Sequence, residues 1–177
     1  MDLHFRDATA GDAPALAAIY RPIVLETSIS FELEPPDAEE FARRIEVAQS
    51  RWAYLVAEDD DGVVAYAYGG ALRTRAAYAW SVETSIYVHA RARRTGVARR
   101  LYPVLFERLA ARGYRNAYAG TTLPNDPSVA LHRAVGFEPI GTYPRVGFKF
   151  GNWHDVAWLH RPLGDGDPLA PPQQPPL

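Results

Sequence analysis

Residues 80–101 constrain this 177-residue chain more than any other stretch, because they predict a strand, a tight basic turn and a helix in immediate succession. Side chains of two kinds alternate through the strand. One face carries Val82, Thr84, Ile86 and Val88, and the other carries Glu83, Ser85 and Tyr87. Apolar spacing then resumes with a helical period after Gly96. We therefore expect a half-buried strand that leads directly into a helix N-terminus.

The turn between them predicts an anion-binding site. It comprises Arg93, Arg94, Thr95, Gly96, Val97 and Ala98, and Arg99 follows in the first helical turn. The first N–H groups of a helix lack partners within it, and the helix dipole favours negative charge there. A solvated loop is the alternative, because many helices begin after a glycine. The three clustered arginines favour a large anionic ligand over that alternative.

Composition limits the classes of function. With 47% hydrophobic and 12% aromatic residues, the chain should form a globular domain. A formal net charge of -2 argues against nucleic-acid binding. The absence of cysteine excludes disulfides, a cysteine nucleophile and thiolate metal sites, and the histidines lack metal-ligand spacing, so we expect no metal. No apolar run is long enough to span a bilayer, so we expect a cytoplasmic protein that does not bind membranes.

The element order β-α-α-β-β-β-α-β-α-β-β predicts a mixed α/β domain over residues 1–163, with helices covering a largely antiparallel sheet. Pro22 lies within the first helical pattern and predicts a kink or a break. Asp126 is the predicted N-cap of the last helix. Gly151-Asn152 is the predicted tight turn between the last two strands. The proline-rich residues 164–177 predict a flexible tail.

Glu83 is the candidate acid–base residue. It lies between apolar neighbours near the middle of the best-defined strand. If that strand borders a cleft, burial would raise the pKa of Glu83 and let the carboxylate accept a proton at neutral pH. The spacing alone fits an ordinary solvent-facing acid equally well.

Two arginines and one histidine also have two interpretations. Arg73 and Arg75 are two residues apart at a predicted strand end, so both should point to one side and could clamp a carboxylate or a phosphinate-like group. An exposed basic loop is the favoured alternative for these residues alone. His132 follows Ser128 by one helical turn, and its spacing alone favours an ordinary surface histidine.

The basic turn resembles the pyrophosphate-binding motif of the GCN5-related N-acetyltransferases, the GNAT superfamily. In that motif Arg or Gln is followed by two residues, glycine, one residue, and glycine or alanine, as in Arg93-Arg-Thr-Gly96-Val-Ala98. Arg94 stands where many members have glycine, and Ala98 where glycine is commoner.

Three further stretches resemble the phosphinothricin N-acetyltransferase, or bialaphos-resistance, branch of this family, which includes methionine sulfoximine acetyltransferases. They are residues 84–88, residues 123–129 with His132, and residues 146–156. The resemblance covers residues 3–163 and leaves out only the tail.

This resemblance implies a GNAT fold and transfer of an acetyl group from acetyl-CoA, held at a splayed strand pair, to the α-amine of a small amino acid. It implies that Glu83 is the general base and that His132 assists. The implied cofactor contacts are Ile86, Tyr87, Val88, Arg93, Arg94, Thr95, Gly96, Val97, Ala98, Arg99, Asn125 and Ser128. The implied acceptor contacts are Phe31, Arg73, Arg75, Tyr78, Glu83 and Tyr87. A homodimer is also implied, in which Phe31 can reach the partner's site.

Two other classes of function remain open from the sequence. One is an acetyltransferase of the same fold for a protein N-terminus or a polyamine, although Arg73 and Arg75 would repel a polycation. The other is a non-catalytic acyl-CoA-binding protein, against which the presence of Glu83 and His132 argues. Phosphinothricin and methionine sulfoximine both present a carboxylate, an amine and a tetrahedral polar head, so the sequence does not rank them.

Overall fold

A seven-stranded sheet in the order β1-β2-β3-β4-β5-β7-β6 forms the centre of the computed structural model, which describes residues 2–167, 169 and 170. All neighbouring strands are antiparallel except β4 and β5, which are parallel. The strands are β1 (His4–Asp7), β2 (Tyr54–Asp59), β3 (Gly62–Ala71), β4 (Ser81–Val88), β5 (Asn116–Thr122), β6 (Glu138–Lys149) and β7 (Asn152–Pro162). The helices are α1 (Ala13–Glu26), α2 (Ala38–Arg51), α3 (Val97–Ala111) and α4 (Asp126–Ala134). The predicted fold class is confirmed.

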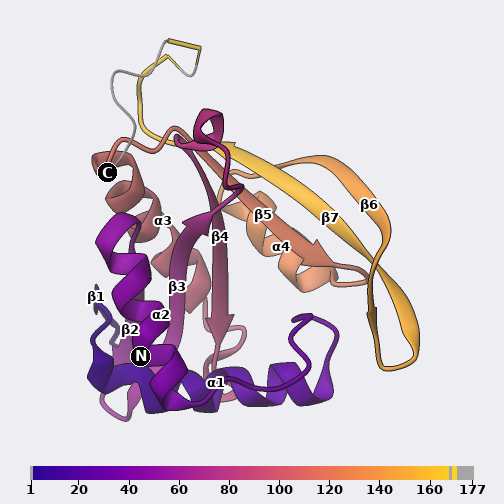
Figure 1. Cartoon of the computed structure of the whole chain (residues 1–177). Helices are drawn as coiled ribbons and strands as arrows, with labels where there is room; N and C mark the ends of the chain where they lie inside the picture. Colours follow the sequence, from indigo (N-terminus) through magenta and orange to yellow (C-terminus); the bar gives the residue numbers. More distant parts are fainter. Residues whose placement is uncertain (1, 168, 171–177) are drawn as a thin grey trace.

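Helices cover both faces of the sheet (Figure 1). On one face, α1 and α2 bury Leu16 and Phe41 in a cluster with Tyr66 of β3. On the opposite face, α3 buries Leu101 and Leu105 in a second cluster, and α4 packs at its margin. Positions spaced three or four residues apart share one side of a helix, and that spacing gives each helix its buried stripe. The helices therefore cover both faces of β2, β3 and β4, whereas the β6–β7 hairpin extends beyond them.

Strand pairing within the sheet is interrupted where β4 and β5 separate. The two strands pair only from Ser81 opposite Asn116 to Glu83 opposite Tyr118. Beyond Glu83, β4 continues to pair with β3 as far as Val88, but no described strand pairs with its other edge. An unpaired strand edge offers N–H and C=O groups to an extended ligand that adds as a further strand. The predicted splayed strand pair is thus present.

One predicted break in the fold is wrong. Pro22 does not divide the first helix, since α1 continues through it from Ala13 to Glu26. Proline removes one helical N–H bond, and burial of the residues on both sides offsets that loss. Ile19, Tyr20, Ile23 and Val24 all lie in the core around it.

Two predicted boundaries are wrong by one residue. Asn125, and not Asp126, is the N-cap of α4, because its side-chain oxygen accepts a hydrogen bond from the Ser128 N–H at 3.2 Å. The β6–β7 turn is centred on Phe150-Gly151, which both have positive φ, so Asn152 already belongs to β7. Two positive-φ central residues match the hairpin turn whose twist suits antiparallel strands.

Strands β6 and β7 form a long hairpin that reaches beyond the helices on one side of the molecule (Figure 1). Large apolar side chains are exposed on this hairpin, namely Ile140, Tyr143, Val146, Phe148, Phe150 and Trp153. Contiguous exposed apolar surface is typical of association sites in proteins.

The chain leaves the sheet after β7. Leu163 is buried against the α3 side, and the Arg115 guanidinium donates to the Asp167 carbonyl. The rest of the predicted tail, residues 168 and 171–177, lies outside the described residues. Within the described part of the chain, no helix has the length and apolar character needed to cross a membrane.

Candidate functional site

A cavity of about 470 Å³, which we call the β4 pocket, lies beside the point where β4 and β5 separate. Five segments line it: the loop after α1, β3 with the loop that follows it, β4, β5, and the β6–β7 hairpin. The lining residues are Ile29, Ser30, Phe31, Tyr68, Arg73, Glu83, Ser85, Tyr87, Gly120, Thr122, Tyr143, Val146, Val156 and Trp158. The pocket therefore collects side chains from most of the chain length.

Glu83 is the acidic residue of this pocket. The predicted alternation is confirmed, because Glu83, Ser85 and Tyr87 all line the pocket from one face of β4. Burial raises the pKa of Glu83 above its usual range, and the positive charge of Arg73 partly opposes this rise. The carboxylate is therefore a stronger base than a surface glutamate, as proton abstraction near neutral pH requires.

The structure separates the predicted arginine pair. Strand β3 ends at Ala71, so Arg73 and Arg75 lie in the loop after it, where the two-residue period of a strand no longer holds. Arg73 lines the pocket, with its guanidinium 5.9 Å from the centre of the Trp158 ring. Arg75 instead begins the short helical turn Ala76–Tyr78, and neither Arg75 nor Tyr78 lines the pocket. Of the two arginines, the structure therefore brings only Arg73 into the β4 pocket.

Two predicted aromatic residues do line the pocket. The Tyr87 ring meets the Tyr20 ring edge-on, with centroids 4.8 Å apart. Phe31 lines the pocket from the loop after α1, and the centre of its ring lies 6.2 Å from that of His154. Phe31 contributes here to the pocket of its own chain.

The basic turn has the geometry of an anion cradle. Arg94 and Gly96 have φ values of 65° and 85°, which is a left-handed backbone that glycine adopts more easily than arginine. The first helical hydrogen bond runs from the Arg100 N–H to the Gly96 carbonyl at 3.2 Å, so the N–H groups of residues 97–99 precede the helical ladder. Val97 is buried and anchors the turn to the core.

The charges around this turn are uncompensated. Among the described residues, no ion pair involves Arg93, Arg94 or Arg99, and all three are exposed. The nearby Arg91 differs, because its guanidinium contacts Asp59 at 2.6 Å. The Thr95 hydroxyl donates to the Ala92 carbonyl at 2.7 Å and holds the turn closed. Three cations therefore surround a helix N-terminus, which is an arrangement that binds phosphate groups.

His132 lies in the core, and the expectation of a surface histidine is wrong. Its Nδ1 lies 2.7 Å from the Ser128 carbonyl oxygen and its Nε2 lies 2.9 Å from the Tyr102 hydroxyl. Since a carbonyl only accepts, Nδ1 carries the proton and Nε2 accepts from Tyr102. Burial lowers the pKa of His132, and the bond to Ser128 opposes this change. His132 packs on the α3 face, opposite the face that carries Glu83, and does not line the β4 pocket.

Asn125 and Ser128 lie at the start of α4. Asn125 lines a second cavity, of about 560 Å³, between the loop after α1 and the β6–β7 turn. Its side-chain oxygen caps the helix, which leaves its NH₂ group available to a ligand. The Ser128 hydroxyl lies 3.2 Å from that of Thr121 on β5.

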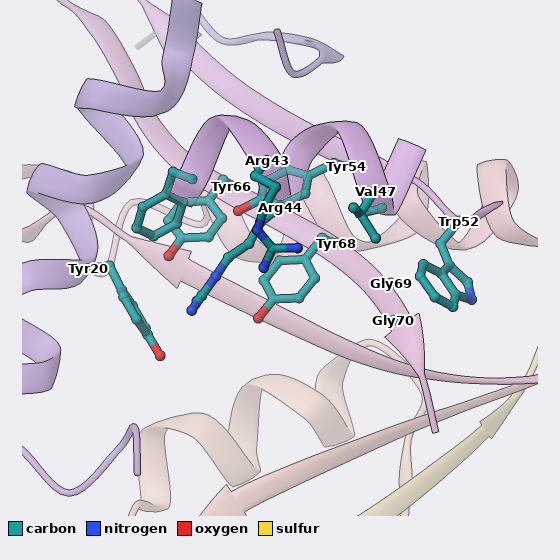
Figure 2. A pocket seen from close by; sticks show the side chains of 12 residues that line it. Tyr20, Arg43, Arg44, Val47, Trp52, Tyr54, Tyr66, Tyr68, Gly69 and Gly70 are labelled. Atoms are coloured by element: carbon teal, nitrogen blue, oxygen red, sulfur yellow. The ribbon is translucent and has the colours of Figure 1, made fainter. Parts of the chain in front are cut away.

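A third cavity, of about 160 Å³, lies beneath α2 and differs from the β4 pocket in its chemistry. Figure 2 shows the rings of Tyr54, Tyr66 and Tyr68 under the helix, with Arg43 and Arg44 reaching toward them. Both arginines are already paired with Glu40, at 2.7 and 2.8 Å. The cavity therefore offers mainly aromatic surface and compensated charge, and it lacks an acid–base group like Glu83.

Sequence reasoning missed several lining residues, among them Tyr68, Ser85 and Val156. Ser85 could have been found, because it shares the Glu83 face of β4 in the alternation. The aromatic character of Trp158 indicates a core or cleft-wall residue, and its exact place depends on pairing with Gly120 across β5 and β7. Its indole N–H is buried and has no hydrogen-bond partner in the described part of the chain. Within that same part, no group of three or more His, Cys, Asp or Glu side chains could hold a metal.

Comparison with known proteins agrees with this geometry. A family profile described as an acetyltransferase (GNAT) domain matches residues 5–158. The chain is 37% identical to a phosphinothricin N-acetyltransferase of Streptomyces viridochromogenes, covering 97% of this chain and 92% of that protein. It is 35% identical to an L-methionine sulfoximine/L-methionine sulfone acetyltransferase of Pseudomonas paraeruginosa, covering 90% and 94%. A crystal structure of a phosphinothricin acetyltransferase from Sinorhizobium meliloti in complex with acetyl-CoA matches with a TM-score of 0.91 and 39% identity, covering 98% and 95%.

Proposed function

Because the chain belongs to the GNAT family of acetyltransferases, we propose that it transfers the acetyl group of acetyl-CoA to the α-amine of phosphinothricin or a closely related amino acid. The observation that carries this proposal is the enclosure of Glu83 and Arg73 in one pocket beside the unpaired edge of β4. Methionine sulfoximine and methionine sulfone are the alternative acceptors, because relatives named for them are similar to this chain over nine-tenths of its length.

The residues at the splayed strands fit acetyl-CoA. The N–H groups of residues 93–98, with Arg93, Arg94 and Arg99, suit its pyrophosphate. The free edge of Ile86, Tyr87 and Val88 suits the amide groups of the pantetheine arm, which would add to β4 like a strand. Asn125 and Ser128 lie at the start of α4 and are the remaining proposed contacts. Bound acetyl-CoA supplies an activated thioester carbonyl.

The β4 pocket fits a small amino acid. The Arg73 guanidinium suits a carboxylate or phosphinate group, and Phe31 and Tyr87 supply apolar walls. Arg75 and Tyr78 were expected among the acceptor contacts, but they lie outside the pocket, so we assign the anionic group to Arg73 alone.

Glu83 has the central role in the proposed chemistry. The acceptor's ammonium is not nucleophilic, and Glu83 takes its proton, directly or through water, so that the amine can attack the thioester. A backbone N–H near Tyr87 or Val88 on the free edge would stabilise the oxyanion. The thiol that leaves has an ordinary pKa near ~8.5, so it departs readily as a thiolate. Positioning of the two reactants favours direct transfer without an acyl-enzyme.

His132 takes a smaller part in this proposal than the sequence suggested. Both of its ring nitrogens are engaged by Ser128 and Tyr102, and its ring is on the far face of the sheet from Glu83. A direct role in proton transfer stays a prediction, and the contacts support a role in holding α4 against α3.

We also infer a homodimer, with a cytoplasmic location remaining a prediction. The exposed apolar surface of the β6–β7 hairpin supports association, since β6 is exposed along nearly its whole length. A second copy of the chain is the proposed occupant because the hairpin also walls the β4 pocket, so association would stabilise the site. That Phe31 reaches the partner's site stays a prediction.

The acceptor is tested by measuring thiol release from acetyl-CoA over a panel of amines. Phosphinothricin, methionine sulfoximine and methionine sulfone should give kcat/KM values well above those of a polyamine or an N-terminal peptide, because only they carry a carboxylate on the same carbon as the reacting amine, within reach of Arg73. A preference for the polyamine or the peptide would reject the proposed acceptor class. Binding of acetyl-CoA without thiol release for any amine would favour the non-catalytic alternative.

Replacing Glu83 by glutamine tests the general base. The variant should lose about 10²- to 10⁴-fold in kcat/KM, the usual contribution of a positioned base. In the wild type, kcat/KM should fall as the pH drops through the raised pKa of Glu83, because the protonated carboxyl cannot accept a proton. Glu83→Gln should lack that acidic limb, and the exposed Glu107→Gln should match the wild type. Full activity of Glu83→Gln across the pH range would remove Glu83 from this role.

Separate alanine substitutions at Arg73 and Arg75 test the acceptor pocket. Arg73→Ala should raise the acceptor KM by about 10- to 100-fold, since a hydrogen bond to a charged group contributes roughly 1.5–3 kcal/mol. Arg75→Ala should change it far less, because Arg75 does not line the pocket. Neither should alter the KM for acetyl-CoA. An unchanged acceptor KM in Arg73→Ala would show that the anionic group binds elsewhere.

Sedimentation equilibrium tests the dimer. The wild type should show about twice the chain mass of 19.6 kDa at micromolar concentration. Phe148→Glu should shift the population toward monomer, because dimer formation would then bury a charge among the rings that are exposed in the single chain. Val47→Glu, which adds the same charge at an exposed apolar position of α2, should leave the dimer intact. A monomeric wild type would reject the inference.

A further inference from the structure

Lys149 is the only lysine in the 177-residue chain, which otherwise uses arginine for its basic side chains. It is also one of the few buried charged residues, with 4% exposure. Its ammonium nitrogen lies 2.7 Å from the Val24 carbonyl oxygen and 2.7 Å from the Ser30 carbonyl oxygen. A single buried cation at the end of β6 therefore bonds to two backbone groups more than 100 residues away in sequence.

The two carbonyls belong to different parts of the chain. Val24 lies in the last turn of α1, where carbonyls have no helical N–H partner and the helix dipole favours positive charge. Ser30 lies in residues 27–34, which we call the 27–34 segment. This segment follows α1 and forms the first part of the loop that leads to α2. The ammonium therefore joins the helix end, the 27–34 segment and the β6–β7 hairpin.

The chemistry of this position requires lysine. A compact ammonium has three donors and can approach two carbonyls at once, whereas a planar guanidinium is wider and directs its donors in a fixed fork. Among the described residues, no carboxylate lies within ion-pairing distance of Lys149. Burial lowers the pKa of Lys149, and the charge of Glu32 opposes this change. Burying a cation without a paired acid is costly, so the two carbonyl contacts and the Phe150 ring, whose centre lies 5.0 Å from the ammonium nitrogen, compensate for it.

The 27–34 segment forms one wall of the β4 pocket, to which it contributes Ile29, Ser30 and Phe31. Other contacts fasten it from the opposite side. The Ser30 hydroxyl lies 2.6 Å from that of Tyr20 on α1, and Glu32 pairs with Arg44 of α2 at 2.8 Å. Lys149 fastens the backbone of the segment to the hairpin through the Ser30 carbonyl.

Strand β6 also leaves space for the segment. A side chain at Gly147, two residues before Lys149, would lie only 2.3 Å from the Phe31 ring. Any larger residue would therefore force Phe31 out of its place. One strand thus holds the backbone of the segment through Lys149 and admits its aromatic side chain at Gly147.

We propose that Lys149 is a positioning residue, which holds the 27–34 segment as a wall of the β4 pocket and so sets the affinity for the acceptor without lining the pocket. This inference rests on the proposed function, because it takes the β4 pocket as the acceptor site. The structural part, the tether itself, can be measured without any reaction.

Lys149→Met is the central variant, since it keeps most of the side-chain volume and removes the ammonium. Amide hydrogen exchange within residues 27–34 should become faster, and the acceptor KM should rise by about tenfold or more, as expected for loss of hydrogen bonds from a charged donor. The KM for acetyl-CoA should stay within about twofold, because the basic turn and the β4 edge make no contact with Lys149. Arg108→Met, which removes an exposed cation on α3, should leave exchange and both KM values unchanged.

A chemical rescue separates positioning from general stability. Because the chain has no cysteine, Lys149→Cys introduces a single thiol that can be alkylated in the unfolded protein before refolding. Alkylation with bromoethylamine restores an ammonium at the right length, and should restore slow exchange in residues 27–34 and the low acceptor KM. Alkylation with iodoacetamide gives a neutral side chain and should restore neither.

Gly147→Ala gives an independent check, because it displaces Phe31 and leaves the ammonium in place. It should raise the acceptor KM alone. Unchanged exchange in residues 27–34 and unchanged acceptor KM in Lys149→Met would overturn the proposal. So would a general increase in exchange with both KM values rising, which would mean that Lys149 only stabilises the fold. A third outcome is that the wild type shows no acetyl transfer while Lys149→Met still exchanges faster only within residues 27–34. That outcome would support the tether and reject only the proposed function.

Discussion

The separation of β4 from β5 after Glu83 is the constraint on which the rest of the structure depends. While the strands pair, their backbone groups satisfy each other, and once they part, the β4 edge must bind something else. Residues 84–88 keep their pairing with β3, so the open edge stays rigid. The same strand then leads into the turn whose N–H groups and arginines attract an anion. One departure from regular sheet pairing therefore places an extended edge, an anion cradle and an acidic side chain within a single run of residues.

The acid at this separation is balanced between two opposing effects. Burial makes the ionised form of Glu83 less stable, and the charge of Arg73 makes it more stable. A fully buried, isolated carboxylate would stay protonated and could not act as a base, while an exposed one would bind protons too weakly to drive transfer. Because Arg73 lines the same pocket, any anionic group that neutralises it on binding would raise the pKa of Glu83 further. Acceptor binding and the strength of the base are therefore coupled.

Local sequence patterns predicted the parts of the fold and site that depend on local physics. The alternation in residues 81–88, the helix start after Gly96 and the order of elements are all decided by neighbours in the chain. Patterns failed where distant contacts decide the outcome. Pro22 is tolerated because the core on both sides of it holds α1 together, and Arg75 does not line the pocket because it begins the turn Ala76–Tyr78. His132 is buried by Tyr102 and Phe137, which no spacing within α4 reveals.

The wall of the β4 pocket shows why such sites are hard to read from a single stretch of sequence. The 27–34 segment has no regular structure of its own, so its conformation is fixed by contacts from α1, α2 and β6. Those contacts use short-range polar groups, each of which tolerates little displacement. The ammonium of Lys149 bonds to the segment from the hairpin, and the hairpin presents the exposed apolar surface on which we propose that a second copy of the chain binds. Association through that surface would stiffen β6, and through Lys149 it would stiffen the pocket wall as well.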